Sequence, residues 1–342
     1  MYVTPRPILT EDPLYAVRFA AIGTLAYAAI PLLDPMMPPI IAALPLGLIA
    51  AQRKAFNPGR AIAGPIAMIV MAFALAWLVN LLRPMPLVYI GAMWLAYFVG
   101  FRMILQTGAQ AGMLIVIMVV LMSIMGMHGT VMVEALRDGF LQAALVALVI
   151  GPLVYFLLPP RTSDVHVDDP TPSGVDATMG AVIRATVLLG LSFWLYAVMN
   201  PSDMMMAIIA AMVLVFPTTH EVFFEARQRI RATFYGSVVA AIILWLFTLS
   251  QHLPILLGMI FLGGLWCGNR MMTGNQPSMV YQYAFSVALA LIAGALSTQE
   301  AGYAMFTRIV LTLTGALVAA LSVALLDAVT QKRVGAVKSA QP

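Results

Sequence analysis

The sequence is dominated by long apolar runs that are separated by short polar breaks. Hydrophobic residues make up 62% of its 342 residues, and Asp, Glu, Lys and Arg together make up only 9%. A soluble domain carries about 25% charged residues, and this chain has too few charges to cover a water-exposed surface. The composition therefore excludes a soluble fold, a disordered chain and a coiled coil. It predicts an all-α polytopic membrane protein.

The apolar runs predict about twelve transmembrane helices. A helix needs about 20 mainly apolar residues to cross a bilayer, and it satisfies its own backbone hydrogen bonds there. The expected spans lie approximately at residues 14–33, 35–51, 61–82, 85–104, 111–127, 133–158, 181–199, 204–217, 232–249, 254–269, 278–297 and 304–327.

The basic residues agree with this count and predict an orientation. If the N-terminus is cytoplasmic, only Arg83, Arg137 and Arg308 of the 18 Lys and Arg residues lie on the opposite side. Membrane proteins keep an excess of Lys and Arg in their cytoplasmic loops. We therefore expect both termini in the cytoplasm.

Short motifs recur at a fixed distance along the chain. Residues 40–43, Ile-Ile-Ala-Ala, recur 168 positions later as residues 208–211. A longer series, G-x-R-M followed by T-G-x-Q, occurs once in each half. Its members are Gly100, Arg102, Met103, Thr107, Gly108 and Gln110, then Gly268, Arg270, Met271, Thr273, Gly274 and Gln276. This recurrence predicts two parallel six-span repeats, residues 1–158 and 181–342, joined by a polar cytoplasmic linker at 159–180.

The two recurring arginines are candidate substrate-binding residues. Arg102 and Arg270 each follow a span and precede a polar turn, and a guanidinium presents a planar fork of donors that matches a carboxylate. If they face each other across the axis between the repeats, they form a cytoplasmic vestibule for an organic anion. The alternative is that both are interfacial anchors whose side chains reach the lipid headgroups.

Neighbouring polar and aromatic residues complete this predicted binding region. Thr107 and Gln110 follow Arg102, while Thr273 and Gln276 follow Arg270. Tyr281, early in the next span, could stack on an aromatic ligand, although such rings more often form an interfacial belt.

Proline-interrupted spans at matching positions point to a transport pathway. The span at 35–51 contains Pro45, and its counterpart at 204–217 is short and ends before Pro217. Interrupted helices at equivalent places in two repeats often form transport sites, but prolines also simply end helices. Asp34 and Asp203 lie near the outer ends of these spans. They are candidates for gating or proton coupling, with solvated loop carboxylates as the alternative.

Other features narrow the possible functions. Arg18 and Arg184, at the starts of their spans, are interpreted as topology anchors. No nucleotide-binding or hydrolytic motif is recognisable, so we expect a protein that is not an enzyme and uses no cofactor. A single cysteine, Cys267, and four scattered histidines offer no metal-site spacing. Because the basic residues are spread over many loops, no nucleic-acid partner is expected.

The region after the eighth expected span resembles a known family. The apolar run 207–216 leads through Pro217 to Arg227, Gln228 and Arg229, and then to Thr233 and Gly236. This pattern is similar to the signature of the fusaric acid resistance and aromatic acid exporter superfamily. The first half contains a weaker version of the same pattern, formed by Pro45, Arg53, Arg60 and Gly64.

The resemblance implies a compact exporter in a bacterial inner membrane. Its substrates would be organic carboxylate anions, aromatic carboxylates among them, and its partner would be a periplasmic membrane-fusion adaptor. Two alternatives remain at this stage, namely a passive organic-anion channel and a membrane scaffold without transport activity. The oligomeric state, the coupling ion and the substrate stay open.

Overall fold

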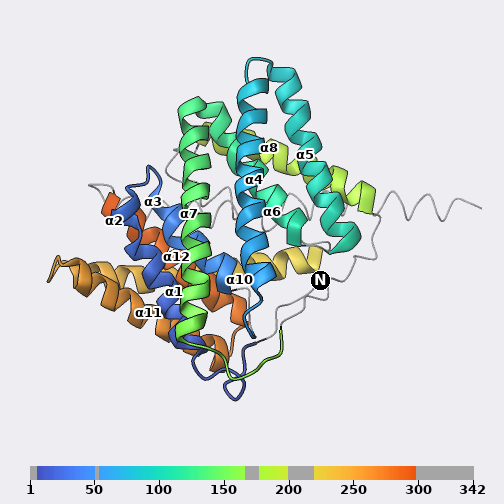
Figure 1. Ribbon diagram of the computed structural model, residues 1–342. Helices are drawn as coiled ribbons and strands as arrows, with labels where there is room; N and C mark the ends of the chain where they lie inside the picture. Colours follow the sequence, from blue (N-terminus) through green and yellow to red (C-terminus); the bar gives the residue numbers. More distant parts are fainter. Residues whose placement is uncertain (1–5, 51–53, 109, 166–176, 199–218, 298–342) are drawn as a thin grey trace, which may run out of the picture.

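The computed structural model describes residues 6–50, 54–108, 110–165, 177–198 and 219–297, and these fold into helices. Figure 1 shows their arrangement. In chain order the helices are α1 (Tyr15–Ala28), α2 (Ile30–Leu33), α3 (Pro38–Ala50), α4 (Pro58–Leu82), α5 (Pro86–Thr107), α6 (Gln110–His128), α7 (Thr130–Leu157), α8 (Ala177–Val198), α10 (Thr219–Phe247), α11 (Leu253–Thr273) and α12 (Ser278–Ser297).

Nine of the helical segments in the described residues are long and apolar enough to cross a membrane, and α3 is a shorter apolar helix. This confirms the prediction of a polytopic helical membrane protein. The expected spans at 204–217 and 304–327 lie outside the described residues. The count of twelve and the duplication therefore stay predictions.

Several helices present large apolar side chains on their outer surface. On α4, Val70, Phe73 and Trp77 are 63%, 44% and 67% exposed, at spacings that place them on one helix face. Water disfavours such a face, whereas lipid tails accept it. The exposed side chains of α4 therefore fit contact with lipid.

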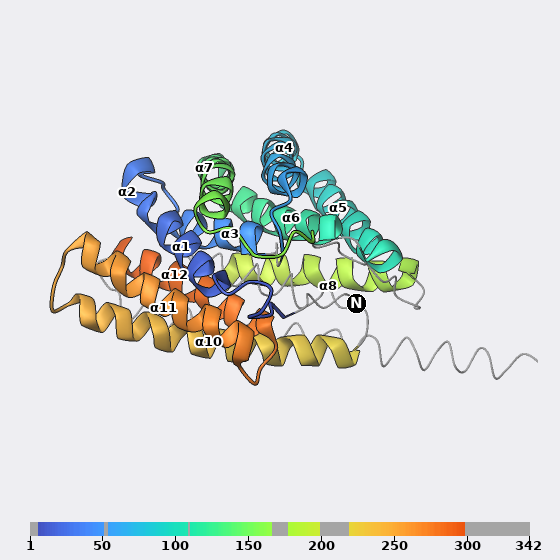
Figure 2. The same cartoon turned by 60° about the horizontal axis from the view of Figure 1, so that its bottom comes forward.

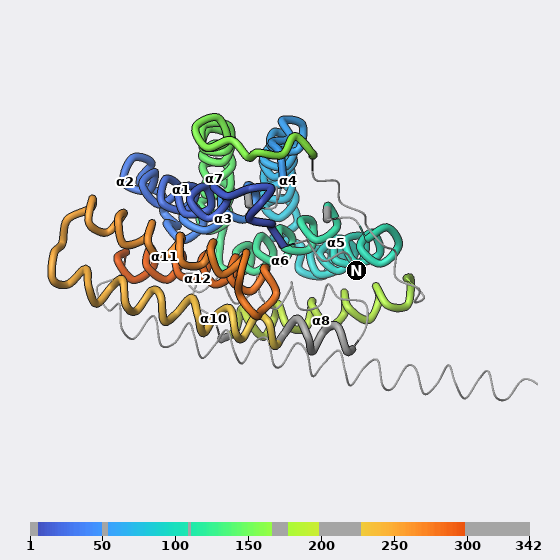
Figure 3. The backbone as a smooth tube through the Cα atoms, turned by 90° about the horizontal axis from the view of Figure 1, so that it is seen from below, coloured from blue at the N-terminus to red at the C-terminus, as the bar shows by residue number. Residues whose placement is uncertain are grey.

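The helices run in two main directions. In Figures 1 and 2, α4 and α7 stand together on one side of the molecule, while α10, α11 and α12 form a layer on the other. Figure 3 shows α4 and α7 nearly end-on and α10 and α11 lengthwise. The two sets consequently surround different interiors.

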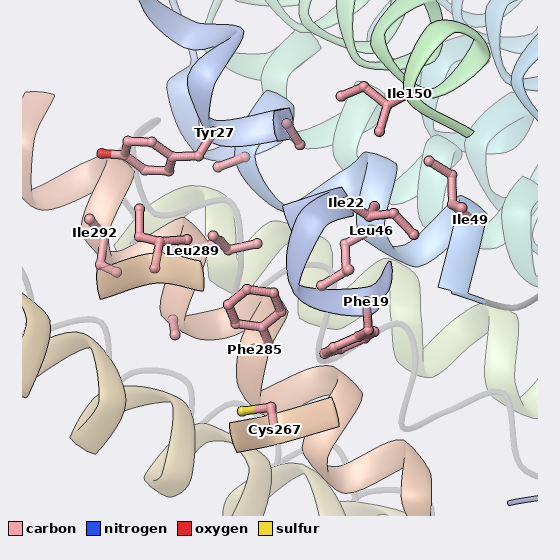
Figure 4. Packing of buried hydrophobic residues seen from close by; sticks show 14 of the residues in the cluster. Phe19, Ile22, Tyr27, Leu46, Ile49, Ile150, Cys267, Phe285, Leu289 and Ile292 are labelled. Carbon is pink, nitrogen blue, oxygen red and sulfur yellow. The ribbon is translucent and has the colours of Figure 1, made fainter. Parts of the chain in front are cut away.

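The interior consists of two main hydrophobic cores. One core is surrounded by α4, α5, α6, α8 and the first half of α7, and we call these helices the first bundle. The second bundle comprises α1, α3, α10, α11, α12 and the second half of α7. Figure 4 shows the second core, where Phe285 and Leu289 of α12 lie near Phe19 of α1 and Leu46 of α3. Helix α7 contributes to both interiors.

The bundles do not follow the two halves of the sequence. Helix α1, from the first half, packs against α11, while α8, from the second half, packs against α5. Small residues allow a close approach in the first of these pairs. A side chain at Gly268 would place its Cβ 2.8 Å from the Cα of Ala16, and one at Gly264 would place it 2.9 Å from the Cα of Ala20.

Short segments tie the helix ends together. The backbone N–H of Arg161, after α7, donates to the carbonyl oxygen of Glu11 before α1 (3.2 Å). The N–H of Ala55 donates to the carbonyl oxygen of Asp164 (3.0 Å), beside a loose ion pair between Lys54 and Asp164 (3.9 Å). The described part of the predicted linker is thus held against the segment that precedes α4.

Candidate functional site

The first G-x-R-M series lies at the end of α5. Arg102 is exposed, and the Thr107 hydroxyl donates to the carbonyl oxygen of Met103 in its own helix (2.7 Å). The helix ends at Gly108, whose φ of 68° is left-handed and suits glycine. Gln110 begins α6, but its side chain lies outside the description. These residues form a helix end with an exposed cation.

The second series occupies the equivalent end of α11. Arg270 is exposed and lies 6.0 Å from the ring centre of Trp266, one turn earlier. The Thr273 hydroxyl donates to the carbonyl oxygen of Asn269 (3.0 Å), as Thr107 does to its own helix. The two threonines therefore close their helices in the same way.

The structure does not bring Arg102 and Arg270 together. Helix α5 packs against α6 and α8, whereas α11 packs against α1 and α12. Among the described residues, neither guanidinium contacts the other. A vestibule made by these two side chains facing each other finds no support in this arrangement, since both point to the surface.

A different pair of arginines converges on the second turn. Arg231 of α10 donates from Nη1 to the side-chain oxygen Oε1 of Gln276 (2.6 Å). Arg6, in the segment before α1, donates from Nη2 to the backbone oxygen of the same glutamine (2.8 Å). Gln276 was predicted as a site residue, whereas Arg6 and Arg231 were not.

Aromatic side chains lie beside this turn. Tyr281 is 6% exposed, and its ring stacks on Tyr235 of α10 (6.0 Å between ring centres, 19°). Trp266 meets Tyr281 edge-on at 6.3 Å. A side chain at Gly274 would place its Cβ 2.7 Å from the Tyr281 hydroxyl. The predicted residues Gln276 and Tyr281 therefore belong to one region, and the burial of Tyr281 does not fit an interfacial belt.

The interpretation of Arg18 as a topology anchor is wrong, because its side chain is buried in the protein. It is 1% exposed and pairs with Asp12, also 1% exposed. It donates from Nη1 to the carbonyl oxygen of Leu158 (2.8 Å) and lies over the Tyr155 ring (4.4 Å). Burial raises the pKa of the Asp12 carboxyl above its usual range, although Arg18 acts in the opposite direction.

Arg184 is likewise buried and not an interfacial anchor. It is 1% exposed on α8, and its Nη1 donates to the carbonyl oxygen of Gly180 (3.2 Å). Headgroups cannot reach such a side chain. Arg18 and Arg184, which stand 166 positions apart in the two predicted repeats, therefore both lie inside the protein.

Sequence reasoning also missed two buried polar groups. Asp12 could have been recognised as a carboxylate six residues before a span-starting arginine. In the first bundle, the Tyr97 hydroxyl hydrogen-bonds to the hydroxyls of Ser123 (2.7 Å) and Ser192 (3.0 Å). Nothing in the local pattern of these residues relates them, because they come from α5, α6 and α8.

The candidate coupling residues lie elsewhere. Asp34 is exposed and ends α2 with a left-handed φ of 42°. Asp203 lies outside the described residues. Pro45 is within α3, which continues through it. In the searched part of the chain, no group of three or more His, Cys, Asp or Glu side chains could hold a metal ion.

Comparisons with known proteins bear on the second half of the chain. A family model described as "Fusaric acid resistance protein-like" matches residues 191–322. Searches of curated proteins and of solved structures gave no match. The matched segment contains the turn at Gln276 together with Arg231 and Tyr281. The segment from residue 191 to residue 322 is therefore similar to this family.

Proposed function

We propose that the protein exports organic carboxylate anions across a bacterial inner membrane, with both termini in the cytoplasm. The observation that carries this proposal is the fusaric acid resistance family match in a chain with nine membrane-length apolar helices in its described part. Members of that superfamily are membrane transporters. Aromatic carboxylates are the favoured substrates, because tyrosines lie beside arginines at the second turn.

The charges on the helix ends support anion selection. Arg102 and Arg270 are exposed where α5 and α11 end, and Arg6 and Arg231 meet at Gln276. Cations near a pathway raise the local concentration of anions. In the proposed orientation this end faces the cytoplasm, so it would collect substrate there, with Thr107, Gln110 and Thr273 as flanking polar groups.

The direction of transport fits the electrical potential. With the inside of the cell negative, an anion gains about 2.3 kcal/mol per charge and 100 mV when it leaves. Asp34 and Asp203, near the proposed outer end, would provide gating or proton transfer. A periplasmic membrane-fusion adaptor would receive the exported anion.

Efflux from intact cells tests the proposal. Cells that express the protein are loaded with labelled benzoate, and loss of the label is compared with that from cells carrying an empty vector. We expect faster efflux from cells that express the protein. If these cells and the empty-vector cells lose each acid of an aromatic panel at the same rate, export is contradicted. A double variant, Arg102→Ala with Arg270→Ala, should slow efflux, and an unchanged rate at normal expression would remove these two arginines from the pathway.

A further inference from the structure

The turn at Gln276 holds two positive charges close to one residue. Arg231 binds its side-chain oxygen and Arg6 binds its backbone oxygen. These acceptors are neutral, so neither contact compensates a charge. Two guanidinium groups held this near each other repel, and an anion between them would remove that repulsion.

Within the described ranges, no carboxylate pairs with Arg6 or Arg231. The ion pairs found there are Arg18 with Asp12, Lys54 with Asp164, and Arg137 with Asp138. A guanidinium has five N–H donors, and a single hydrogen bond to Gln276 uses one of them. Each arginine therefore keeps donors that an oxyanion could engage.

An aromatic surface begins next to these charges. Arg231 and Tyr235 are four residues apart on α10 and share one face of the helix. The Tyr235 ring stacks on Tyr281, whose hydroxyl approaches the backbone of Gly274, two residues before Gln276. A flat ring attached to a bound carboxylate would thus meet tyrosine rings.

We propose that Arg6, Arg231 and Tyr235 form the recognition site for an aromatic carboxylate at this end of the second bundle. The carboxylate replaces the Gln276 side-chain oxygen on Arg231 and binds its fork in a bidentate manner, with Arg6 supplying the second charge. The substrate ring packs against Tyr235. This inference rests on the proposed function, because it assigns the residues that would select the exported anion.

Binding to the purified full-length protein in lipid nanodiscs tests the site. Calorimetric titrations compare benzoate with benzamide, which lacks the charge, and with cyclohexanecarboxylate, which lacks the aromatic ring. We expect saturable benzoate binding, at least about tenfold weaker binding of benzamide, and binding of cyclohexanecarboxylate a few-fold weaker than that of benzoate. Absent benzoate binding, or equal affinity for benzamide, would overturn the proposal.

Variants assign the binding to these residues. Arg231→Gln should weaken benzoate binding at least about tenfold, because it removes the charged fork. The matched control Arg83→Gln removes an exposed arginine from the end of α4, which has no part in the proposed site, and should bind as the wild type does. Arg6→Gln acts from a segment outside the helices, so it tests the site even if Arg231→Gln does not fold. Tyr235→Leu should weaken binding of benzoate but not of cyclohexanecarboxylate.

Binding and efflux fail in different ways. Benzoate binding that needs Arg231, without efflux from cells, would overturn export and leave the site intact. Efflux that is the same in wild type, Arg231→Gln and Arg6→Gln would leave export intact and overturn the site. Wild-type affinity for benzoate in both variants would overturn the site as well.

Discussion

The two bundles solve the burial of polar groups differently. In the first bundle, the hydroxyls of Ser123 and Ser192 both lie within hydrogen-bond distance of the buried Tyr97 hydroxyl. In the second bundle, Leu265 and Leu291 stand 168 positions after Tyr97 and Ser123, and Ala26 stands 166 positions before Ser192, the separation of Arg18 and Arg184. Its buried ion pair lies instead at one end, where Arg18 meets Asp12.

A second comparison concerns the two arginines that the predicted duplication relates to each other. Arg18 and Arg184 stand 166 residues apart, and both are 1% exposed. Arg18 binds the Asp12 carboxylate, whereas Arg184 donates to the carbonyl oxygen of Gly180 in its own helix. The position of a buried guanidinium is thus common to both bundles, while these contacts and the central hydroxyls differ.

The largest effect is expected at the buried ion pair of the second bundle. Arg18→Met leaves the Asp12 charge buried without a partner and should lower the unfolding free energy by about 3–5 kcal/mol. Chemical denaturation of the protein in lipid or detergent measures this loss. The exposed pair of Arg137 and Asp138 provides the control, and Arg137→Met should cost less than about 1 kcal/mol.

A double variant sharpens this result. Asp12→Leu combined with Arg18→Met removes both charges, so most of the lost stability should return. If the double variant is as unstable as Arg18→Met alone, the lost packing of the Arg18 stem, and not the stranded charge, accounts for the effect.

The next effect concerns two glycines at matching places. A Cβ at Gly268 meets the backbone of Ala16, which cannot rotate away, so Gly268→Ala should cost about 1–3 kcal/mol. A Cβ at Gly100 meets the Val116 side chain at 2.7 Å but backbone only at 3.4 Å, at the carbonyl oxygen of Gly112, so Gly100→Ala should cost less. Denaturation of both variants tests this order, with Gly91→Ala, which meets nothing within 4 Å, as the control. Equal losses would remove this distinction between the bundles.

A smaller effect is expected at the hydroxyl cluster of the first bundle. Tyr97→Phe removes a hydroxyl that lies within hydrogen-bond distance of Ser123 and Ser192, but both serines can still donate to carbonyl oxygens of their own helices. The unfolding free energy should therefore fall by only about 1 kcal/mol. Tyr27→Phe in the second bundle is the matched control, since no hydrogen bond of the Tyr27 hydroxyl is found in the described structure. A similar loss in both variants would speak against a specific role of the cluster.

The smallest effect is a pH dependence that belongs to the second bundle. Because the pKa of Asp12 is raised by burial, the folded state binds this proton more tightly than the unfolded chain does. Its contribution to stability is present below about pH 3.8 and is lost as the pH rises through the raised pKa. The free energy of unfolding should therefore change with pH across these values. This change should be smaller in Asp12→Asn and the same as in the wild type in Asp138→Asn. A slope unchanged by Asp12→Asn would assign the pH dependence to other groups.

The sequence predicted where the helices lie along the chain better than it predicted which helices and side chains contact each other. The run expected at 133–158 agrees with α7 at Thr130–Leu157. The span expected at 232–249 starts later than the helix that contains it, since α10 begins at Thr219. Hydropathy detects membrane depth, whereas a helix continues through polar residues such as Arg231. For this reason Arg231 stands just outside the expected span, although it lies on α10 and binds Gln276.

Partners that are distant in the sequence could not be predicted from local patterns. Arg18 binds the carbonyl oxygen of Leu158, 140 residues away, and a hydropathy plot shows the same arginine as a span-end cation. Gln276 and Tyr281 were found because they lie within one short stretch after α11. Arg6 reaches that stretch from 270 residues away. Short-range motifs therefore led to Gln276 and Tyr281, whereas their contacts with Arg6, Arg231 and Tyr235 depend on the tertiary fold.

Helix α7 has a mechanical consequence for the whole molecule. Phe140, in its first half, packs into the first core, and Val154, in its second half, packs into the second. The two bundles thus share one continuous helix, and they cannot move past each other as separate bodies unless α7 bends or unwinds. A rotation of one bundle relative to the other would therefore have to bend α7 between Phe140 and Val154.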